Sequence, residues 1–156
     1  MPLDAKVLTV SDACHDGSRE DRSGPAAVER LERAGFTVVA RGLCPDGVEP
    51  VATAIVELAR SFTGLLLTTG GTGFGPRDLT PEATRSVIER EAPGLAEAMR
   101  AASPKGRLSR GVAGTVGDCL VLNTPGSVTG TVESLEAVLD VLPHALALLA
   151  GEDPHH

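Results

Sequence analysis

The first half of the chain alternates short apolar runs with segments in which apolar residues recur at helical spacing. An uninterrupted apolar run is typical of a strand that is buried on both faces, and residues 65–67 (LLL) are the clearest example. Strands that alternate with helices predict a three-layer α/β/α fold around a mostly parallel central sheet. The strands are expected at 6–11, 36–43 and 65–67, and the helices at 25–34, 51–61 and 81–90.

The second half of the chain predicts a small antiparallel addition to this sheet. Residues 109–116 alternate loosely between apolar and polar, and residues 119–123 (CLVLN) form a clear strand after the turn at Gly117-Asp118. Two strands joined by a glycine turn are expected to pair as a hairpin.

The remaining segments are helical by pattern. One helix is expected at 95–102, and helical spacing resumes at residue 128, where Pro143 either kinks the helix or begins a new one. No repeat, linker or low-complexity tract interrupts the pattern, so residues 1–156 are expected to form a single domain.

The apolar run at 65–67 opens into a loop, TTGGTGFGPRDLTPE over residues 68–82, that holds four glycines within six residues. Glycines in this number let backbone N–H groups crowd together and point at one spot, which suits a phosphate or another anion. Thr80 and the Pro-Glu after it form a helix-start signature, with Thr80 as the expected N-cap. Because a helix N-terminus also attracts anions, the loop predicts an anion site with the pair Arg77-Asp78 beside it.

Two familiar phosphate-binding motifs do not match this loop. A Walker-type loop needs Gly-Lys-Ser/Thr, and residues 68–82 contain no lysine. The dinucleotide fingerprint needs G-x-G-x-x-G at the start of a helix, and the glycine spacing at 71–75 misses it. A tight turn without a ligand is the alternative for these glycines, and the adjacent charged pair and helix start favour a binding role.

Polar loops follow the other expected strands as well. Ser11 and Asp12 follow the first strand, Asp46 follows the second, and residues 123–127 (NTPGS) follow the last. Since the carboxyl ends of parallel strands meet at one edge of a sheet, these loops are expected to converge at a topological switch point. Ordinary turns remain the alternatives for Pro-Asp-Gly around Asp46 and for the later Pro-Gly pair. The polar segment at 13–24 is expected to be a solvated, mobile loop.

The acids that these loops bring together point to a metal-assisted reaction. Asp12, Asp46 and Asp78 would lie beside backbone donors, and Mg²⁺ prefers carboxylate oxygens and substrate phosphates. Phosphoryl and nucleotidyl transfer need positioning and charge neutralisation more than covalent protein chemistry. The residues alone therefore predict an Mg²⁺-assisted reaction on a phosphate-bearing small molecule.

Composition narrows the possible partners. The formal net charge of −7, from 14 basic and 21 acidic residues, argues against a general nucleic-acid binder. No secretion signal or membrane-length apolar run is visible, so a cytoplasmic protein without membrane contact is expected. The three cysteines lie far apart without metal or redox spacing, and Cys44 and Cys119, at strand ends, are expected to be buried thiols.

Residues 68–73 (TTGGTG) and 77–84 (RDLTPEAT) resemble the signature of the molybdopterin adenylyltransferases of molybdenum-cofactor biosynthesis, which MoaB-like proteins and gephyrin-type G domains share. The resemblance runs from residues 8–12 to the terminal helix. It implies a similar α/β fold and Mg²⁺- and ATP-dependent adenylylation of the terminal phosphate of molybdopterin, with pyrophosphate as the second product. The alternative is a pterin-binding scaffold or MoaB-like protein of the same fold without catalysis.

The resemblance also implies roles for particular residues. The family has an acidic residue with a catalytic role in a Pro-Asp loop that matches Asp46, although an acidic residue often follows there and this chain has Gly47. The Arg77-Asp78 form fits the adenylyltransferase branch better than the MoaB-like one. We therefore expect Asp46 and Asp78 to be catalytic and to hold the metal. The expected substrate- and nucleotide-binding residues are Ser11, Asp12, Thr69, Gly70, Gly71, Thr72, Gly73, Arg77, Thr80, Asn123, Pro125, Gly126 and Ser127.

The chain is predicted to form a homotrimer, as the resemblance implies. The terminal helical segment has more apolar residues than are typical of a helix with one face exposed to solvent. They are Leu139, Val141, Leu142, Leu146, Leu148 and Leu149. A well-buried helix is the alternative. Light scattering at micromolar concentration is expected to give three times the chain mass, and a monomer mass would contradict the prediction.

Overall fold

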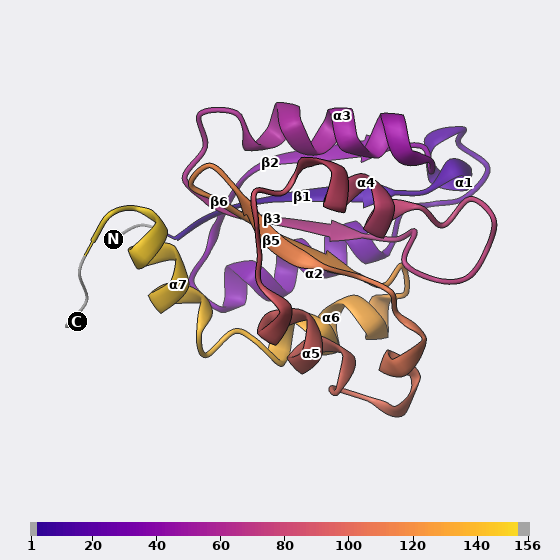
Figure 1. Cartoon of the computed structure of the whole chain (residues 1–156). Helices are drawn as coiled ribbons and strands as arrows, with labels where there is room; N and C mark the ends of the chain where they lie inside the picture. Colours follow the sequence, from indigo (N-terminus) through magenta and orange to yellow (C-terminus); the bar gives the residue numbers. More distant parts are fainter. Residues whose placement is uncertain (1–2, 153–156) are drawn as a thin grey trace.

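A six-stranded sheet lies between two layers of helices (Figure 1) in the computed structural model, which describes residues 3–152. The order of strands across the sheet is β2-β1-β3-β6-β5-β4. The strands are β1 (Asp4–Val10), β2 (Thr37–Cys44), β3 (Gly64–Thr69), β4 (Arg90–Glu91), β5 (Ala113–Val116) and β6 (Cys119–Thr124). The helices are α1 (Asp12–His15), α2 (Ser23–Arg33), α3 (Val48–Ala59), α4 (Thr80–Val87), α5 (Pro93–Arg100), α6 (Val128–Glu136) and α7 (Leu142–Leu149), with a 3₁₀ turn η1 at Pro104–Leu108.

The sheet is mostly parallel. Strand β1 pairs in parallel with β2 on one side and β3 on the other, and β3 pairs in parallel with β6. The expected hairpin is present, because β5 runs antiparallel to β6, and the short β4 is antiparallel to β5. The three-layer α/β/α fold predicted from the pattern is confirmed. Since β6 is parallel to β3, the loop after β6 leaves the sheet at the same edge as the loops after β1, β2 and β3.

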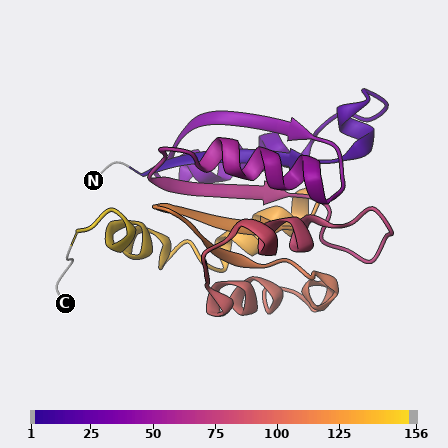
Figure 2. The ribbon, with the colours of Figure 1, turned by 45° about the horizontal axis from the view of Figure 1, so that its top comes forward.

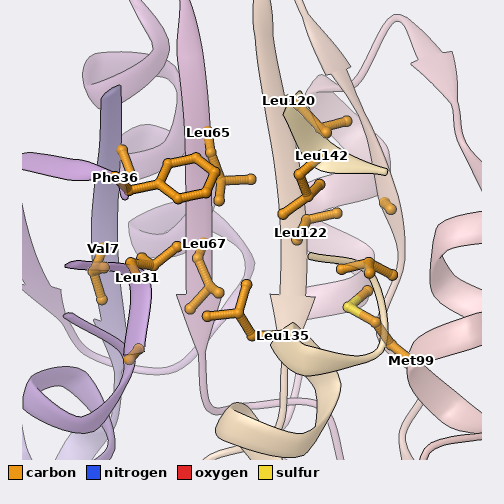
Figure 3. Packing of buried hydrophobic residues seen from close by; sticks show 14 of the residues in the cluster. Val7, Leu31, Phe36, Leu65, Leu67, Met99, Leu120, Leu122, Leu135 and Leu142 are labelled. Carbon is orange, nitrogen blue, oxygen red and sulfur yellow. The ribbon is translucent and has the colours of Figure 1, made fainter. Parts of the chain in front are cut away.

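Two hydrophobic clusters, one on each face of the sheet, make up the core. The helices α2, α5, α6 and α7 pack on one face, and α3 and α4 pack on the other (Figures 1 and 2). The alternation of side chains along β3 sends Leu65 and Leu67 into the first cluster and Leu66 into the second, and all three are fully buried. Figure 3 shows Leu65 and Leu67 packed beside Leu31 of α2, Phe36 and Leu135 of α6. The apolar run thus anchors both layers.

The helix predicted at 81–90 ends earlier than expected, so the prediction is wrong for its last turn. Helix α4 ends at Val87, and residues 88–92 turn into an extended segment whose Glu89 and Ala92 amides donate to Thr115 and Ala113 of β5. Pairing with a strand more than twenty residues further along the chain overrides the local helical pattern, because an extended edge strand satisfies these backbone groups.

The terminal segment is divided into two helices. Helix α7 begins at Leu142 with Pro143 in its first turn, so the proline begins a helix and does not kink one. Leu142 and Leu146 are buried in the core, while Val141 and Leu148 remain 45% and 41% exposed. The described part of the chain contains no helix long and apolar enough to cross a membrane.

Cys44 and Cys119 are buried, as predicted, and burial raises the pKa of the Cys44 thiol to about 11 and that of the Cys119 thiol to about 12. The thiolate is the reactive species, and these raised pKa values keep both buried thiols protonated at pH 8. An aromatic disulfide reagent at pH 8 is expected to react rapidly with the half-buried Cys14 alone, and with the other two thiols only after unfolding. Rapid reaction of three thiols per folded chain would contradict this.

Candidate functional site

A cavity of about 680 Å³ opens at the carboxyl ends of the parallel strands. Its walls come from the loops after β1, β2, β3 and β6, so the predicted convergence of these loops is present in the structure. In Figure 2 the segment around α1 and the loop between β3 and α4 project beyond this end of the sheet. The lining residues are Thr9, Val10, Ser11, Cys14, Arg19, Glu20, Asp21, Arg22, Ser23, Asp46, Thr69, Gly71, Asp78, Gly126, Ser127 and Val128.

About half of the residues expected from the sequence line this cavity. Those on the wall are Ser11, Thr69, Gly71, Gly126 and Ser127, together with both expected catalytic acids, Asp46 and Asp78. The remaining expected residues lie behind the wall or beside it: Asp12, Gly70, Thr72, Gly73, Arg77, Thr80, Asn123 and Pro125. Most of this second group has bonding partners within the protein, and these contacts hold the lining residues in place.

Three of the loops, those after β1, β2 and β3, are joined by contacts among Asp12, Asp46 and Arg77. The backbone N–H of Asp12 donates to Asp46 Oδ2 at 2.9 Å, and the backbone N–H of Asp46 donates to Asp12 Oδ1 at 3.1 Å. The Arg77 guanidinium donates to both carboxylate oxygens of Asp12 at 3.0 Å and to the Asp46 carbonyl oxygen at 2.9 Å. The bidentate ion pair therefore ties the loop after β3 to the loops after β1 and β2.

The two acids of this junction have opposite pKa shifts. The hydrogen bond from Arg77 lowers the pKa of Asp12 below its usual range. Burial raises the pKa of Asp46, and the negative charges of Asp12 and Asp78 raise it further. Asp46 Oδ1 makes no hydrogen bond within the described residues, so this oxygen is available to a ligand.

Thr80 holds the glycine loop onto α4. Its hydroxyl donates to the Gly70 carbonyl oxygen at 2.9 Å, and its backbone N–H donates to the Gly71 carbonyl oxygen at 3.1 Å. The expected role of Thr80 as N-cap is wrong, because α4 already includes Thr80 and its N-cap is Leu79. The hydroxyl is instead used by a loop that returns from β3, a contact that local sequence does not reveal.

Gly70 and Gly71 both have positive φ, of 109° and 71°, which other residues rarely adopt. A Cβ on Gly70 would overlap the carbonyl oxygen of Val10, and a Cβ on Gly71 would overlap the hydroxyl of Thr80. The same Cβ on Gly71 would lie 3.1 Å from Asp46 Oδ1. These two glycines are therefore required for close packing of the loop against β1 and α4.

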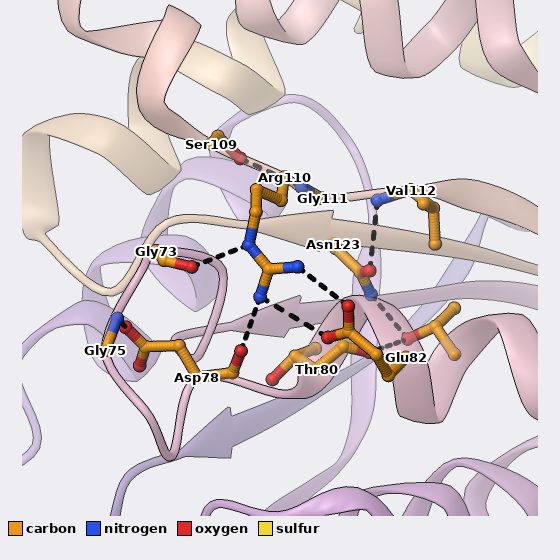
Figure 4. A network of polar contacts seen from close by, with 11 residues as sticks. Gly73, Gly75, Asp78, Thr80, Glu82, Ser109, Arg110, Gly111, Val112 and Asn123 are labelled. Atoms are coloured by element: carbon orange, nitrogen blue, oxygen red, sulfur yellow. Dashed lines mark hydrogen bonds and ion pairs between the residues drawn. The ribbon is translucent and has the colours of Figure 1, made fainter.

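Arg110 holds the far side of the loop, as Figure 4 shows. Its guanidinium donates to the carbonyl oxygens of Gly73 at 2.8 Å and Asp78 at 2.6 Å, and it forms an ion pair with Glu82 at 2.7 Å. The side chain of Asp78 accepts a hydrogen bond from the Gly75 N–H through Oδ2, and its Oδ1 makes none within the described residues. Sequence reasoning missed Arg110, because nothing near residue 110 marks an arginine that bonds to a loop so much earlier in the chain.

Asn123 lies beneath the cavity, away from its wall. It is 2% exposed, and its side-chain amide donates to the hydroxyls of Thr68 and Thr84, each at 3.0 Å. Its side-chain oxygen accepts the Val112 N–H at 3.1 Å (Figure 4). With these bonds, Asn123 joins β3, β6 and α4 and supports the wall from below.

The polar segment after α1 is a second feature that the sequence interpretation missed. Residues 19–23, expected to be a solvated loop, form a wall of the cavity. Asp21 accepts hydrogen bonds from the Thr9 hydroxyl at 2.8 Å and the Gly24 N–H at 3.0 Å, and it contacts Arg41 at 3.3 Å. These bonds tie the segment to β1, α2 and β2.

The donor set suits a hard cation that is shared with substrate phosphates. Asp46 and Asp78 come from different loops, line one cavity, and each has an oxygen without a hydrogen bond in the described chain. Mg²⁺ is usually held by one or two carboxylates plus substrate oxygens and waters. No group of three or more His, Cys, Asp or Glu among residues 3–152 could hold a metal by itself. The residues present therefore fit a metal that arrives with its substrate.

Fold and cavity together define an open α/β protein with a cavity at its topological switch point, which is where ligands bind in proteins of this class. The model of the family described as "Probable molybdopterin binding domain" matches residues 6–144, and the chain belongs to this family.

Relatives of known name agree with this assignment. The chain is 35% identical over 165 residues to the molybdopterin adenylyltransferase of Escherichia coli, and the match covers 93% of this chain and 84% of that protein. It is 39% identical over 153 residues to the molybdenum cofactor synthesis protein cinnamon of Drosophila melanogaster, with 94% of this chain and 25% of the relative covered. The chain thus spans about a quarter of the length of the Drosophila protein.

A solved structure supports the fold closely. The molybdopterin biosynthesis enzyme MoaB from Thermus thermophilus superposes with a TM-score of 0.91 at 48% identity, over 96% of this chain and 98% of that one. The predicted resemblance to the adenylyltransferase and MoaB-like family is therefore confirmed.

Asp46→Asn is expected to be at least as stable as the parent at pH 7. The pKa of Asp46 in the folded protein lies above its ordinary value of 3.8, which applies to the unfolded chain. The charged carboxylate therefore lowers the free energy of unfolding at pH values above the folded pKa, and it has no effect at pH values below the unfolded pKa. The difference in Tm between Asp46→Asn and the parent should therefore shrink as the pH falls from the folded pKa of Asp46 to its unfolded pKa. Thermal unfolding followed by circular dichroism between pH 7 and about pH 3.5 measures it.

Asp12→Asn is the matched control, with the opposite sign. The pKa of Asp12 is lowered by Arg77, so its charge stabilises the fold above the unfolded value and this stabilisation is lost as the pH falls through the folded pKa. This variant is expected to have a lower Tm than the parent at pH 7. An Asp46→Asn protein that is also less stable than the parent at pH 7 would contradict the prediction.

Proposed function

We propose that the protein is a molybdopterin adenylyltransferase, which uses Mg²⁺ and ATP to adenylylate the terminal phosphate of molybdopterin and releases pyrophosphate. The observation that carries the proposal is the meeting of Asp46 and Asp78, from separate loops, in the cavity that the glycine loop lines. The names of relatives that this chain covers along most of their length support the reaction.

The cavity has the size and chemistry that the reaction needs. Its volume of about 680 Å³ lies within the range of small-molecule sites, about 300–1,000 Å³. The loop at Gly71 and the turn at Gly126 and Ser127 face it from neighbouring strands, β3 and β6. Phosphate groups of the two substrates would bind along the glycine loop, where backbone N–H groups orient them for attack.

Asp46 and Asp78 would hold Mg²⁺ through their free oxygens, Oδ1 of each side chain. When bound, Mg²⁺ neutralises charge that develops on the phosphates. Arg77 positions Asp46 through its bonds to Asp12 and to the Asp46 carbonyl, and Arg110 positions Asp78 through the Asp78 carbonyl. Neither arginine is free to bind substrate without giving up these contacts.

The alternative function is pterin binding without catalysis, in the manner of a scaffold or carrier. The 48% identity to a protein named MoaB favours keeping this alternative. The direct test is incubation with molybdopterin, ATP and Mg²⁺. Adenylylated molybdopterin and pyrophosphate support the proposal, whereas pterin binding without product supports the alternative.

We further propose that the chain acts in the cytoplasm as a single domain that assembles into a trimer.

Asp78→Asn is expected to lower the adenylylation rate on the order of a hundredfold or more, because it removes charge beside the phosphates while keeping shape. The Gly75 N–H can still bond to the amide oxygen, so the loop should fold normally. The rate is measured at saturating substrates, with circular dichroism as the folding control. A folded variant with the parent rate would refute the role of Asp78.

Asp46 and Asp78 are expected to act as a unit. The double variant Asp46→Ala with Asp78→Ala should therefore lose little more activity than the worse single variant. If the two residues acted independently, the fold losses of activity in the two single variants would multiply in the double variant. Full activity in Asp46→Ala alone would leave Asp46 as a turn residue and Asp78 as the only supported acid.

A further inference from the structure

The segment between α1 and α2 places two arginines in the cavity wall. Arg19 and Arg22 are the only basic residues among the described residues that line the cavity. The other lining charges are acidic, from Glu20, Asp21, Asp46 and Asp78, and Asp21 is already paired with Arg41. A substrate with several phosphate charges would meet net repulsion here unless these arginines, or a bound cation, balance it.

Both guanidinium groups are free of strong protein contacts. The side chain of Arg19 makes no hydrogen bond or ion pair within residues 3–152. Arg22 makes only a loose contact of 3.7 Å with Glu20, and both of these side chains are about four-fifths exposed, at 79% and 80%. Arg77 and Arg110, by contrast, are bonded to Asp12 and Glu82.

The backbone that carries the two arginines is held firmly. The Arg19 N–H donates to the Ala13 carbonyl oxygen at 3.1 Å, and Asp21 ties the segment to β1 and α2. Helix α2, 11 residues long, begins at Ser23 in the same wall. The Asp21 carboxylate already accepts the Gly24 N–H of its first turn and Pro25 has no N–H, so the positive charge of this wall comes from the two guanidinium groups. Fixed backbone with uncommitted guanidinium groups is the arrangement expected of an anion-binding wall.

We propose that Arg19 and Arg22 form a binding site for the polyphosphate of the nucleotide, on the wall formed by residues 19–23. The inference rests on the proposed function and names the part of the site that takes the triphosphate. Arginine suits this role because its planar fork bonds phosphate oxygens in pairs. The phosphate of the pterin substrate has the same chemistry, and separate KM values for ATP and for molybdopterin distinguish the two.

The test compares Arg19→Gln, Arg22→Gln and the double variant with the parent. Each single change is expected to raise the KM for ATP about tenfold, equivalent to about 1.4 kcal/mol, with kcat within about twofold and the KM for molybdopterin unchanged. Binding of inorganic tripolyphosphate, measured by calorimetry in the presence of Mg²⁺, should weaken to the same extent. Arg22 makes no side-chain capping bond to α2, so its replacement removes no cap.

Two matched controls separate charge from structure. Arg33→Gln changes an exposed arginine at the far end of α2 and should alter nothing. Glu20→Gln removes a negative charge between the two arginines and should tighten tripolyphosphate binding. Opposite effects of neighbouring substitutions in one exposed segment are expected from charge and not from misfolding.

Several outcomes would overturn the inference. A parent protein that forms adenylylated product while the double variant keeps the parent KM for ATP refutes this site and leaves the proposed function intact. A rise confined to the KM for molybdopterin assigns the wall to the pterin phosphate and also refutes it. If the parent binds neither tripolyphosphate nor ATP, both the inference and the proposed function fail. If the parent binds them but makes no product, the proposed reaction fails, and equal tripolyphosphate binding by the parent and the double variant then refutes the inference.

Discussion

The close packing of Gly70 and Gly71 is the constraint on which the rest of the site depends. At these positions β3 leaves the sheet so near to β1 and α4 that a Cβ would overlap Val10 on one side and Thr80 on the other. The chain can make this approach only with two residues that lack a Cβ and accept positive φ. The turn directs the loop so that Arg77 reaches Asp12 and Asp78 reaches the cavity.

Many polar groups around the cavity form hydrogen bonds that hold the loops, and a few polar groups that line the cavity have no such partner among the described residues. Four side chains each bond to two or more segments that are distant in sequence: Arg77, Arg110, Asp21 and Asn123. One oxygen each of Asp46 and Asp78 has no protein partner in the described chain. A wall held by such bonds can keep these carboxylates in place before substrate arrives, which is what positioning catalysis requires.

The raised pKa of Asp46 means that its negative charge costs folding stability at neutral pH. Burial near Asp12 and Asp78 disfavours its charge, whereas the Arg77 pair favours the charge of Asp12. A carboxylate kept in an unfavourable environment gains most from a bound cation, because the cation removes the repulsion between neighbouring acids. Under the proposed function, folding stability and cation binding therefore make opposite demands on Asp46.

The sequence by itself determined the layers, the parallel sheet, the hairpin and the four loops, because burial on both faces and turn chemistry are local properties of a strand and its ends. It also determined the glycine loop and both acids, since these sit next to a recognisable strand. Only the tertiary structure decided that β4 replaces the last turn of a helix, that Thr80 and Asn123 support the loop from within, and that Arg110 and residues 19–23 belong to the site. Each of these depends on a contact between segments far apart in the chain, and the pattern of neighbouring residues contains no information about which distant partner satisfies a hydrogen bond.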